Sequence, residues 1–443
     1  GYHREVVSFT WTNATGEPEL DWLSYGLPSM LAFDIDRISP VISVATPFNS
    51  EALRNQLKRQ TSPTDIPPSL AVQIARDMRS AALVTGSFDV DGKTYFLSAR
   101  LVDAYTGEII GEQEIETTDW LDGVDRMSAA LLAILEVMPA DDKFDEPIRQ
   151  HFSDTIDAIR HYTEGEVAIS FDNDYPTGIA GFTKAVQLDP QFAEARGALS
   201  VSHYLMRNLE SAREEATRAL RDGYRLSDSS KFALKAQRYI YDGDFERGQR
   251  VLDIWTEVQP NSPRAYFSQA RLLRVLGGQQ ALDKAQRAYD RLLELNPTNI
   301  GVYNSKAEVE LQRGDYASAA AYFEQYLEID PDSGDARLGL ASVYQAAGDL
   351  DRAQQVLEYA AVLLDDPVEP GLALARLQAR RGESETAISR LDDLLEIADA
   401  PQQRLQILTA RLEILASVGR IREALDTQEK VSELARAVMP PMT

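Results

Sequence analysis

Three arginines give this sequence its clearest candidate for specific binding chemistry. Arg264, Arg271 and Arg274 follow one another at i, i+7 and i+10 in a segment with helical periodicity, so their side chains share one helix face. A guanidinium group binds a carboxylate through two parallel hydrogen bonds, and the stripe is therefore a candidate site for a partner's carboxylate. The alternative is that these arginines form ion pairs with Glu or Asp side chains on adjacent helices.

Four further polar residues are predicted on the same side of neighbouring helices. They are Gln237, Asn304, Glu308 and Gln345. Each is a candidate for contacting a bound partner, and for each the alternative is ordinary solvated surface.

The residues that catalysis or metal binding would need form no recognisable pattern. The sequence Gly92-Lys93-Thr94 resembles the end of a phosphate-binding loop, but position 87 is Ser87, where that motif needs glycine. No serine stands in a G-x-S-x-G turn. The histidines, His3, His151, His161 and His203, form no HExxH or other ligand cluster. The sequence therefore predicts a protein that is not an enzyme, with no catalytic residues, no metal and no cofactor.

Charge and composition restrict the class of partner. The net charge of −25 at pH 7 disfavours nucleic-acid binding, because phosphate backbones bind to basic faces. A soluble, self-repelling surface and a preference for cationic ligands both remain open. The absence of cysteine excludes disulfides and suits an oxidising compartment.

The candidate residues belong to a repeated unit. Five alanines are spaced by 34, 37, 34 and 34 residues, at Ala236, Ala270, Ala307, Ala341 and Ala375. A glycine follows each alanine by seven residues, at Gly243, Gly277, Gly314, Gly348 and Gly382. Glycine ends a helix by adopting positive φ at no steric cost, and a nearby Asp or Glu favours the start of the next helix. The unit is therefore a pair of antiparallel helices.

This period and pattern resemble the tetratricopeptide repeat. Weaker copies lie before and after the five, over residues 157–190, 193–226 and 412–438, giving about eight helical pairs. Stacked pairs share one core, and the resemblance implies a groove lined by first helices that receives a protein or peptide. The repeat register directs Arg271 and Arg274 toward that groove.

The first 118 residues follow a different hydrophobic pattern. Alternating apolar residues predict strands over 5–11, 40–47, 81–90, 94–104 and 108–118, with helices over 15–38, 49–59 and 69–78. This order predicts a small α/β domain of four or five strands. The predicted fold class is thus α+β: an α/β domain over 1–118, a helical linker over 119–152, and an all-α superhelical solenoid over 153–443.

Two segments resemble known sequences of bacterial regulators. VVSFTWTNATGEPELDWLSYGLPSMLAFDIDRI and GSFDVDGKTYFLSARLVDAYTGEII are similar to the opening and the hairpin of TolB N-terminal-like domains. The resemblance covers residues 5–118. It implies the sensory region of a membrane-anchored regulator of the Ser/Thr kinase, winged-helix or adenylate cyclase type.

The sequence thus favours a non-catalytic, extracytoplasmic region that binds a ligand or protein, with a membrane tether expected upstream of residue 1. The alternative is a free scaffold or assembly factor, secreted or cytoplasmic, without a fused effector.

Overall fold

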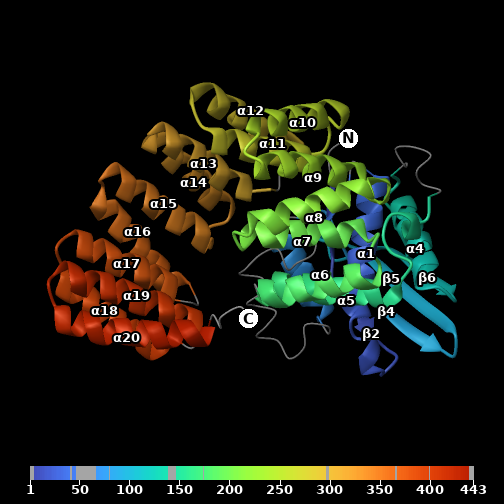
Figure 1. Ribbon diagram of the computed structural model, residues 1–443, viewed down its shortest axis with the longest axis horizontal. Coiled ribbons are helices and arrows are strands. Elements are labelled where there is room, and N and C mark those ends of the chain that lie inside the picture. The colour runs from blue at the N-terminus through green and yellow to red at the C-terminus, as the bar shows by residue number, and fades with distance from the viewer. Residues whose placement is uncertain are drawn as a thin grey trace. The chain divides into compact units, whose positions relative to one another are not determined.

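The computed structural model consists of a small sheet region followed by a long helical repeat array (Figure 1). It describes residues 4–39, 42–45, 66–78, 80–137, 146–172, 174–295, 299–364, 367–398 and 400–438. The chain divides into two compact units, Gly1–Asn299 and Ile300–Thr443. The fold class predicted from the sequence is confirmed, whereas the helix predicted over 49–59 lies outside the described residues.

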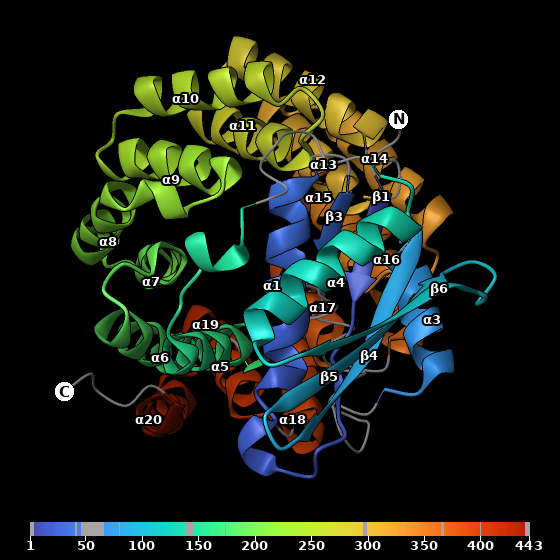
Figure 2. The same cartoon turned by 90° about the vertical axis from the view of Figure 1, so that its right-hand side faces the viewer.

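The sheet has six strands in the order β3-β1-β4-β5-β6, with β2 paired to β4. The strands are β1 (Arg4–Ser8), β2 (Thr12–Asn13), β3 (Ile42–Ala45), β4 (Ala82–Asp91), β5 (Thr94–Asp103) and β6 (Ile109–Thr117). β3, β1 and β4 run parallel, whereas β4, β5 and β6 run antiparallel, and Figure 2 shows these last three side by side. The sheet exceeds the predicted size because β2, only two residues long, pairs separately.

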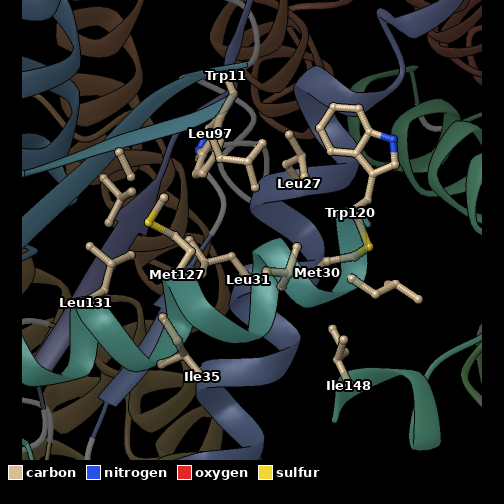
Figure 3. Packing of buried hydrophobic residues seen from close by; sticks show 14 of the residues in the cluster. Trp11, Leu27, Met30, Leu31, Ile35, Leu97, Trp120, Met127, Leu131 and Ile148 are labelled. Atoms are coloured by element: carbon tan, nitrogen blue, oxygen red, sulfur yellow. The ribbon is translucent and has the colours of Figure 1, made fainter. Parts of the chain in front are cut away.

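Helices cover both faces of the sheet. On one face, α1 (Leu23–Ile38) and α4 (Trp120–Ile134) pack against Leu97 and Leu101 of β5. Leu31 of α1 and Met127 of α4 lie near each other in this core (Figure 3). On the other face, α3 (Pro68–Asp77) packs against β1 and β4. The predicted alternation of side chains along β5 is confirmed for Leu97, Ala99 and Leu101, which are buried in this core, whereas Val102 is buried in the cluster on the other face.

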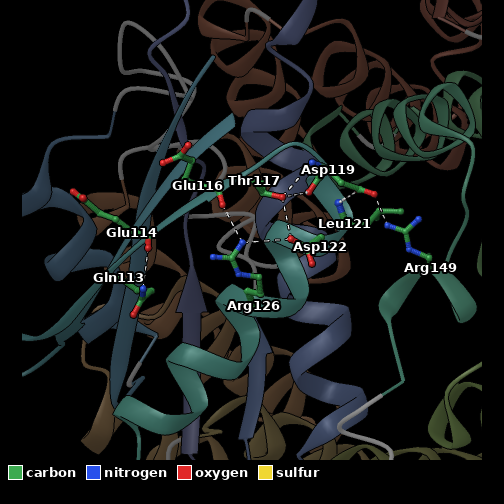
Figure 4. A network of polar contacts seen from close by, with 9 residues as sticks. All are labelled: Gln113, Glu114, Glu116, Thr117, Asp119, Leu121, Asp122, Arg126 and Arg149. Carbon is green, nitrogen blue, oxygen red and sulfur yellow. Dashed lines mark hydrogen bonds and ion pairs between the residues drawn. The ribbon is translucent and has the colours of Figure 1, made fainter. Parts of the chain in front are cut away.

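The connection from β6 to α4 is held by a polar network. Asp119 accepts a hydrogen bond from the Leu121 backbone N–H at 2.9 Å and pairs with Arg149, while Arg126 donates to the Glu116 carbonyl at 2.9 Å (Figure 4). An N-terminal Asp of this kind satisfies a free N–H group of the helix. Helix α4 also packs on the sheet and on α1. The domain boundaries predicted after residues 118 and 152 stay a prediction.

Sixteen helices within the described residues form eight antiparallel pairs. The first unit contains α5 (Ile156–Asp172), α6 (Tyr175–Leu188), α7 (Ala193–Leu205), α8 (Leu209–Arg221), α9 (Asp228–Tyr241), α10 (Phe245–Val258), α11 (Pro263–Leu276) and α12 (Gln279–Leu295). The second contains α13 (Gly301–Arg313), α14 (Tyr316–Ile329), α15 (Gly334–Ala347), α16 (Leu350–Leu363), α17 (Val368–Arg380), α18 (Ser384–Ile397), α19 (Pro401–Ser417) and α20 (Ile421–Val438).

The predicted repeat register is confirmed. Ala270, Ala307 and Ala341 are at most 1% exposed, because each lies where helices touch. All five repeat glycines take φ between +67° and +84°. At three of these turns the next Asp caps the following helix, with Asp244, Asp315 and Asp349 as the capping residues.

Within the first unit, the sheet region and the first helical pairs share one core. Phe152, Phe192 and Ala195 belong to the same buried cluster as the α1 side chains, and Phe152 stacks at a tilt on Phe33 of α1 with ring centroids 5.1 Å apart. On the other face of the sheet, Phe171 of α5 joins the cluster beneath α3. The first repeats are therefore fixed to the α/β fold by buried contacts.

Candidate functional site

The first unit contains a recess between helices of its first four repeats, with a volume of about 270 Å³. Helices α5, α6, α7, α9 and α11 supply its lining. Its apolar lining residues include Ile169, Phe182, Val201, Leu205 and Leu234, of which Val201 and Leu205 are exposed at the rim. Its polar lining residues include Tyr162, Glu166, Glu194, Ser230, Gln237 and Arg264. We call this site the recess.

A close crossing of α5 and α6 forms one side of the recess. A Cβ on Gly181 would lie 2.8 Å from the His161 carbonyl oxygen, and one on Gly178 would lie 2.4 Å from the Ile169 side chain. No side chain fits at these contacts without a shift, so the glycines permit the two helices to approach. Tyr162 and Glu166, at i and i+4 on α5, then share the face that lines the recess.

The repeat register brings three other polar residues to the recess. Glu194, Ser230 and Arg264 each lie six residues before a small buried residue on their own helix, which is Ser200, Ala236 or Ala270. They therefore occupy equivalent positions near the starts of α7, α9 and α11. Arg264 is exposed, whereas Ser230 is buried.

Two carboxylates, Glu166 and Glu194, line the recess, and a third, Asp36, interacts electrostatically with Arg264 and Glu194. Burial, and then the nearby charge of Glu194, raise the pKa of Glu166 to about 7. Burial also raises the pKa of Glu194, partly opposed by the Ser230 hydroxyl and by Arg264. Asp36 on α1 is affected in the same way: burial raises its pKa, and Arg264 opposes the shift. One guanidinium thus offsets two of the three carboxylates, and no cation of the described residues acts on Glu166.

Hydrogen bonding leaves part of this site unsatisfied. Glu194 Oε1 is buried and has no hydrogen-bond partner. Most buried polar atoms in proteins have such a partner, and leaving one unmade costs free energy. The Glu194 carboxylate, which lines the recess, therefore keeps an unsatisfied acceptor in the folded chain.

Of the seven residues predicted from the sequence, the structure brings two together. Gln237 and Arg264 line the recess. Arg271 is exposed and Arg274 half-buried farther along α11, and neither lines it. The remaining three lie in the second unit, where Asn304 is exposed, Glu308 is half-buried, and Gln345 accepts a hydrogen bond from Arg380 at 3.2 Å.

Sequence reasoning missed Asp36, Tyr162, Glu166 and Glu194. The second repeat is hard to recognise because Arg207, with φ of +63°, takes the place of the usual glycine. Extending the register through Arg207 would have aligned Glu194 with Arg264. The signal for Tyr162 and Glu166 was weaker, since α5 and α6 cross on glycines and not on the alanine pattern. Asp36 depends on tertiary packing, which the repeat pattern does not encode.

No group of three or more His, Cys, Asp or Glu residues in the described part of the chain could hold a metal ion. None of the helices described is long and apolar enough to cross a membrane.

Comparisons with known sequences identify the repeats. Residues 234–300, 273–338, 310–368 and 368–393 match models of the tetratricopeptide repeat. The mitochondrial import receptor subunit TOM70 of Rattus norvegicus is 24% identical over 211 residues, covering 46% of this chain and 34% of the receptor. The putative cellulose synthase operon protein C of Escherichia coli O157:H7 is 26% identical over 178 residues, covering 37% of this chain and 15% of that protein. The chain therefore spans about a third or less of the length of these relatives.

Among solved structures, yeast Tom70 has a TM-score of 0.49 at 17% identity, covering 64% of this chain and 62% of that one. The human IFIT1 dimer has a TM-score of 0.43 at 16% identity, covering 71% of this chain and 77% of that one. The resemblance of residues 5–118 to TolB N-terminal-like domains stays a prediction. The family matches agree with the confirmed register, and residues 234–393 are tetratricopeptide repeats.

Proposed function

We propose that this chain is a non-catalytic binding region whose first repeats hold a protein or peptide partner in the recess. The observation that supports this most is the recess itself: apolar walls, several polar side chains, and a buried carboxylate oxygen without a partner. Small sites with apolar walls and few directed polar groups are typical of ligand recognition. Tetratricopeptide relatives such as an import receptor subunit are in keeping with a protein partner.

The wider proposal is that the chain is the extracytoplasmic sensory region of a membrane-anchored regulator. Its support is the TolB-like resemblance of residues 5–118 together with the lack of cysteine. Because the sheet region and the first repeats share one core, a partner in the recess would contact α5, which packs on α1. The alternative is a free scaffold or assembly factor, for which the recess would serve as a docking point without any effector.

A photo-crosslinking amino acid at the rim tests partner binding. It would replace Val201, which lines the recess and is 37% exposed, in the full-length protein in its native cells. The matched control would replace Val362 in the second unit, which is 88% exposed. We expect a discrete crosslinked protein from position 201 alone. Equal crosslinking from both positions, or none from position 201, would contradict the proposal.

A reporter fusion tests the location. A reporter active only outside the cytoplasm, fused to the C-terminus of the full-length protein, is expected to be active. Activity of a cytoplasmic reporter in its place would remove the sensory assignment and favour the free scaffold.

A further inference from the structure

We propose that the recess receives one basic side chain, lysine or arginine, from the bound partner. This inference rests on the proposed function, because it names the chemistry that the same site recognises. Three observations bear on it: the shape of the recess, its charge balance and its unsatisfied acceptor.

The size and walls of the recess fit a long side chain with a charged end. Its volume is about 270 Å³, near the lower end of the range for ligand pockets. Ile169, Phe182 and Leu234 line it with apolar surface, against which the methylene groups of a lysine or arginine can pack. Tyr162 and Tyr175 also line it, and aromatic rings attract cations.

The charge balance lacks one cation. Arg264 acts on Asp36 and Glu194, whereas Glu166 experiences only burial and the like charge of Glu194. A buried carboxylate is stabilised by an opposite charge with hydrogen bonds. A basic group beside Glu166 and Glu194, which both line the recess, supplies that charge.

The opposite ligand charge fits less well. A partner's carboxylate could approach Arg264, which is exposed at the recess. It would, however, bring a fourth carboxylate to a group of three, of which Arg264 already offsets two. The carboxylates already raise one another's pKa, and a further like charge adds to that repulsion, so the site selects a cation.

Binding of a cation is then coupled to release of a proton. The titratable and charged groups that face the recess are Tyr162 and Glu166 on α5, Tyr175 on α6, Glu194 on α7 and Arg264 on α11, with Asp36 of α1 close to Arg264 and Glu194. Of the acids, Glu166 has a pKa of about 7, so a bound cation favours its ionised form. If only that form binds, the affinity rises about ten-fold between pH 6 and pH 8. The ligand itself stays charged over this range.

The test is a saturation-transfer NMR titration of the full chain with three probes. They are the Nα-acetyl amides of lysine, arginine and norleucine, of which norleucine has a similar apolar arm and no charge. We expect the lysine probe, the arginine probe or both to bind at least several-fold more tightly than norleucine, with an affinity that rises about ten-fold from pH 6 to pH 8. Equal affinity for all three probes, or an affinity independent of pH, would overturn the inference.

Matched variants connect the result to the recess. Glu166→Gln is expected to weaken binding of the basic probe and to abolish its pH dependence. Glu257→Gln, an exposed position on α10, is expected to change neither. If Glu166→Gln does not fold, as judged by circular dichroism, Glu194→Gln replaces it and is expected to weaken binding at pH 8. Unchanged binding in the folded recess variant would overturn the inference.

Failure of the inference differs from failure of the proposed function. A crosslinked partner at position 201 with no preference for basic probes would reject the basic side chain and leave the binding function intact. A clear preference for basic probes without any crosslinked partner would reject the proposed function and leave the chemistry of the recess intact.

Discussion

The two units differ in how the polar side chains on their repeat helices are partnered. In the second unit, Gln345 is bonded by Arg380, and the Lys306 ammonium lies over the Tyr322 ring at 4.6 Å. In the recess, Glu166 has no counter-ion and Glu194 Oε1 has no hydrogen-bond partner among the described residues. Partnered groups stabilise the fold, whereas unpartnered ones cost free energy. The recess is therefore the better candidate for binding.

Two helical pairs, one from each unit, also differ in how they pack. α13 and α14 meet on alanines, with Ala307 and Ala319 fully buried. α5 and α6 meet on glycines, and the Phe182 ring occupies the space in which a Cβ on Gly165 would lie, 2.8 Å away. Glycine costs backbone entropy in a helix, so the first pair depends more on its large apolar residue.

The largest expected effect follows from that dependence. Phe182→Ala removes a fully buried ring and should lower the free energy of unfolding by about 3–5 kcal/mol. Phe245→Ala, at a position 37% exposed, is the control and should cost much less. Urea denaturation followed by circular dichroism measures both, and equal losses would show that the α5–α6 packing does not depend on Phe182.

A second substitution tests the alanine contact. Ala307→Leu should overpack the α13–α14 contact and cost roughly 1–3 kcal/mol, because Ala307 is 0% exposed. Ala321→Leu, on the exposed side of α14, should leave the melting temperature close to that of the parent. If Ala307→Leu also melts like the parent, the repeat register is wrong.

A third prediction uses the carboxylate of the recess. The folded-state pKa of Glu166 lies above its ordinary value, so the folded chain retains a proton that the unfolded chain loses. The contribution of this group to stability is therefore lost as pH rises from about 4.5 to 7. Glu166→Gln should raise the free energy of unfolding by about 1–2 kcal/mol at pH 8 and much less at pH 5. The effect at pH 8 is only of this size because Glu166 keeps part of its surface in solvent. An equal effect at both pH values would contradict the raised pKa.

The sequence predicted much of the fold because its signals are local. Alanine and glycine spacing defined the helical pairs, and period-two alternation defined β5. The site was predicted only in part, through Gln237 and Arg264, because Arg207 replaces the glycine that marks the register in the later repeats, which hid the equivalence of Glu194 to Arg264. Asp36 comes close to Arg264 through the packing of α1 on the first repeats, which no local spacing encodes.

The smallest expected effect compares two glutamines. Gln345 accepts a hydrogen bond from Arg380 at an exposed site, so Gln345→Ala should cost no more than about 0.5 kcal/mol. Gln237 lines the recess and has no hydrogen-bond partner among the described residues, so Gln237→Ala should leave stability unchanged or slightly raised. Urea denaturation, with Arg380→Ala and the double variant added, isolates the Gln345 pair. A loss of more than about 1 kcal/mol in Gln237→Ala would mean that this side chain supports the fold, and the distinction between a partnered second unit and an open recess would then fail at that position.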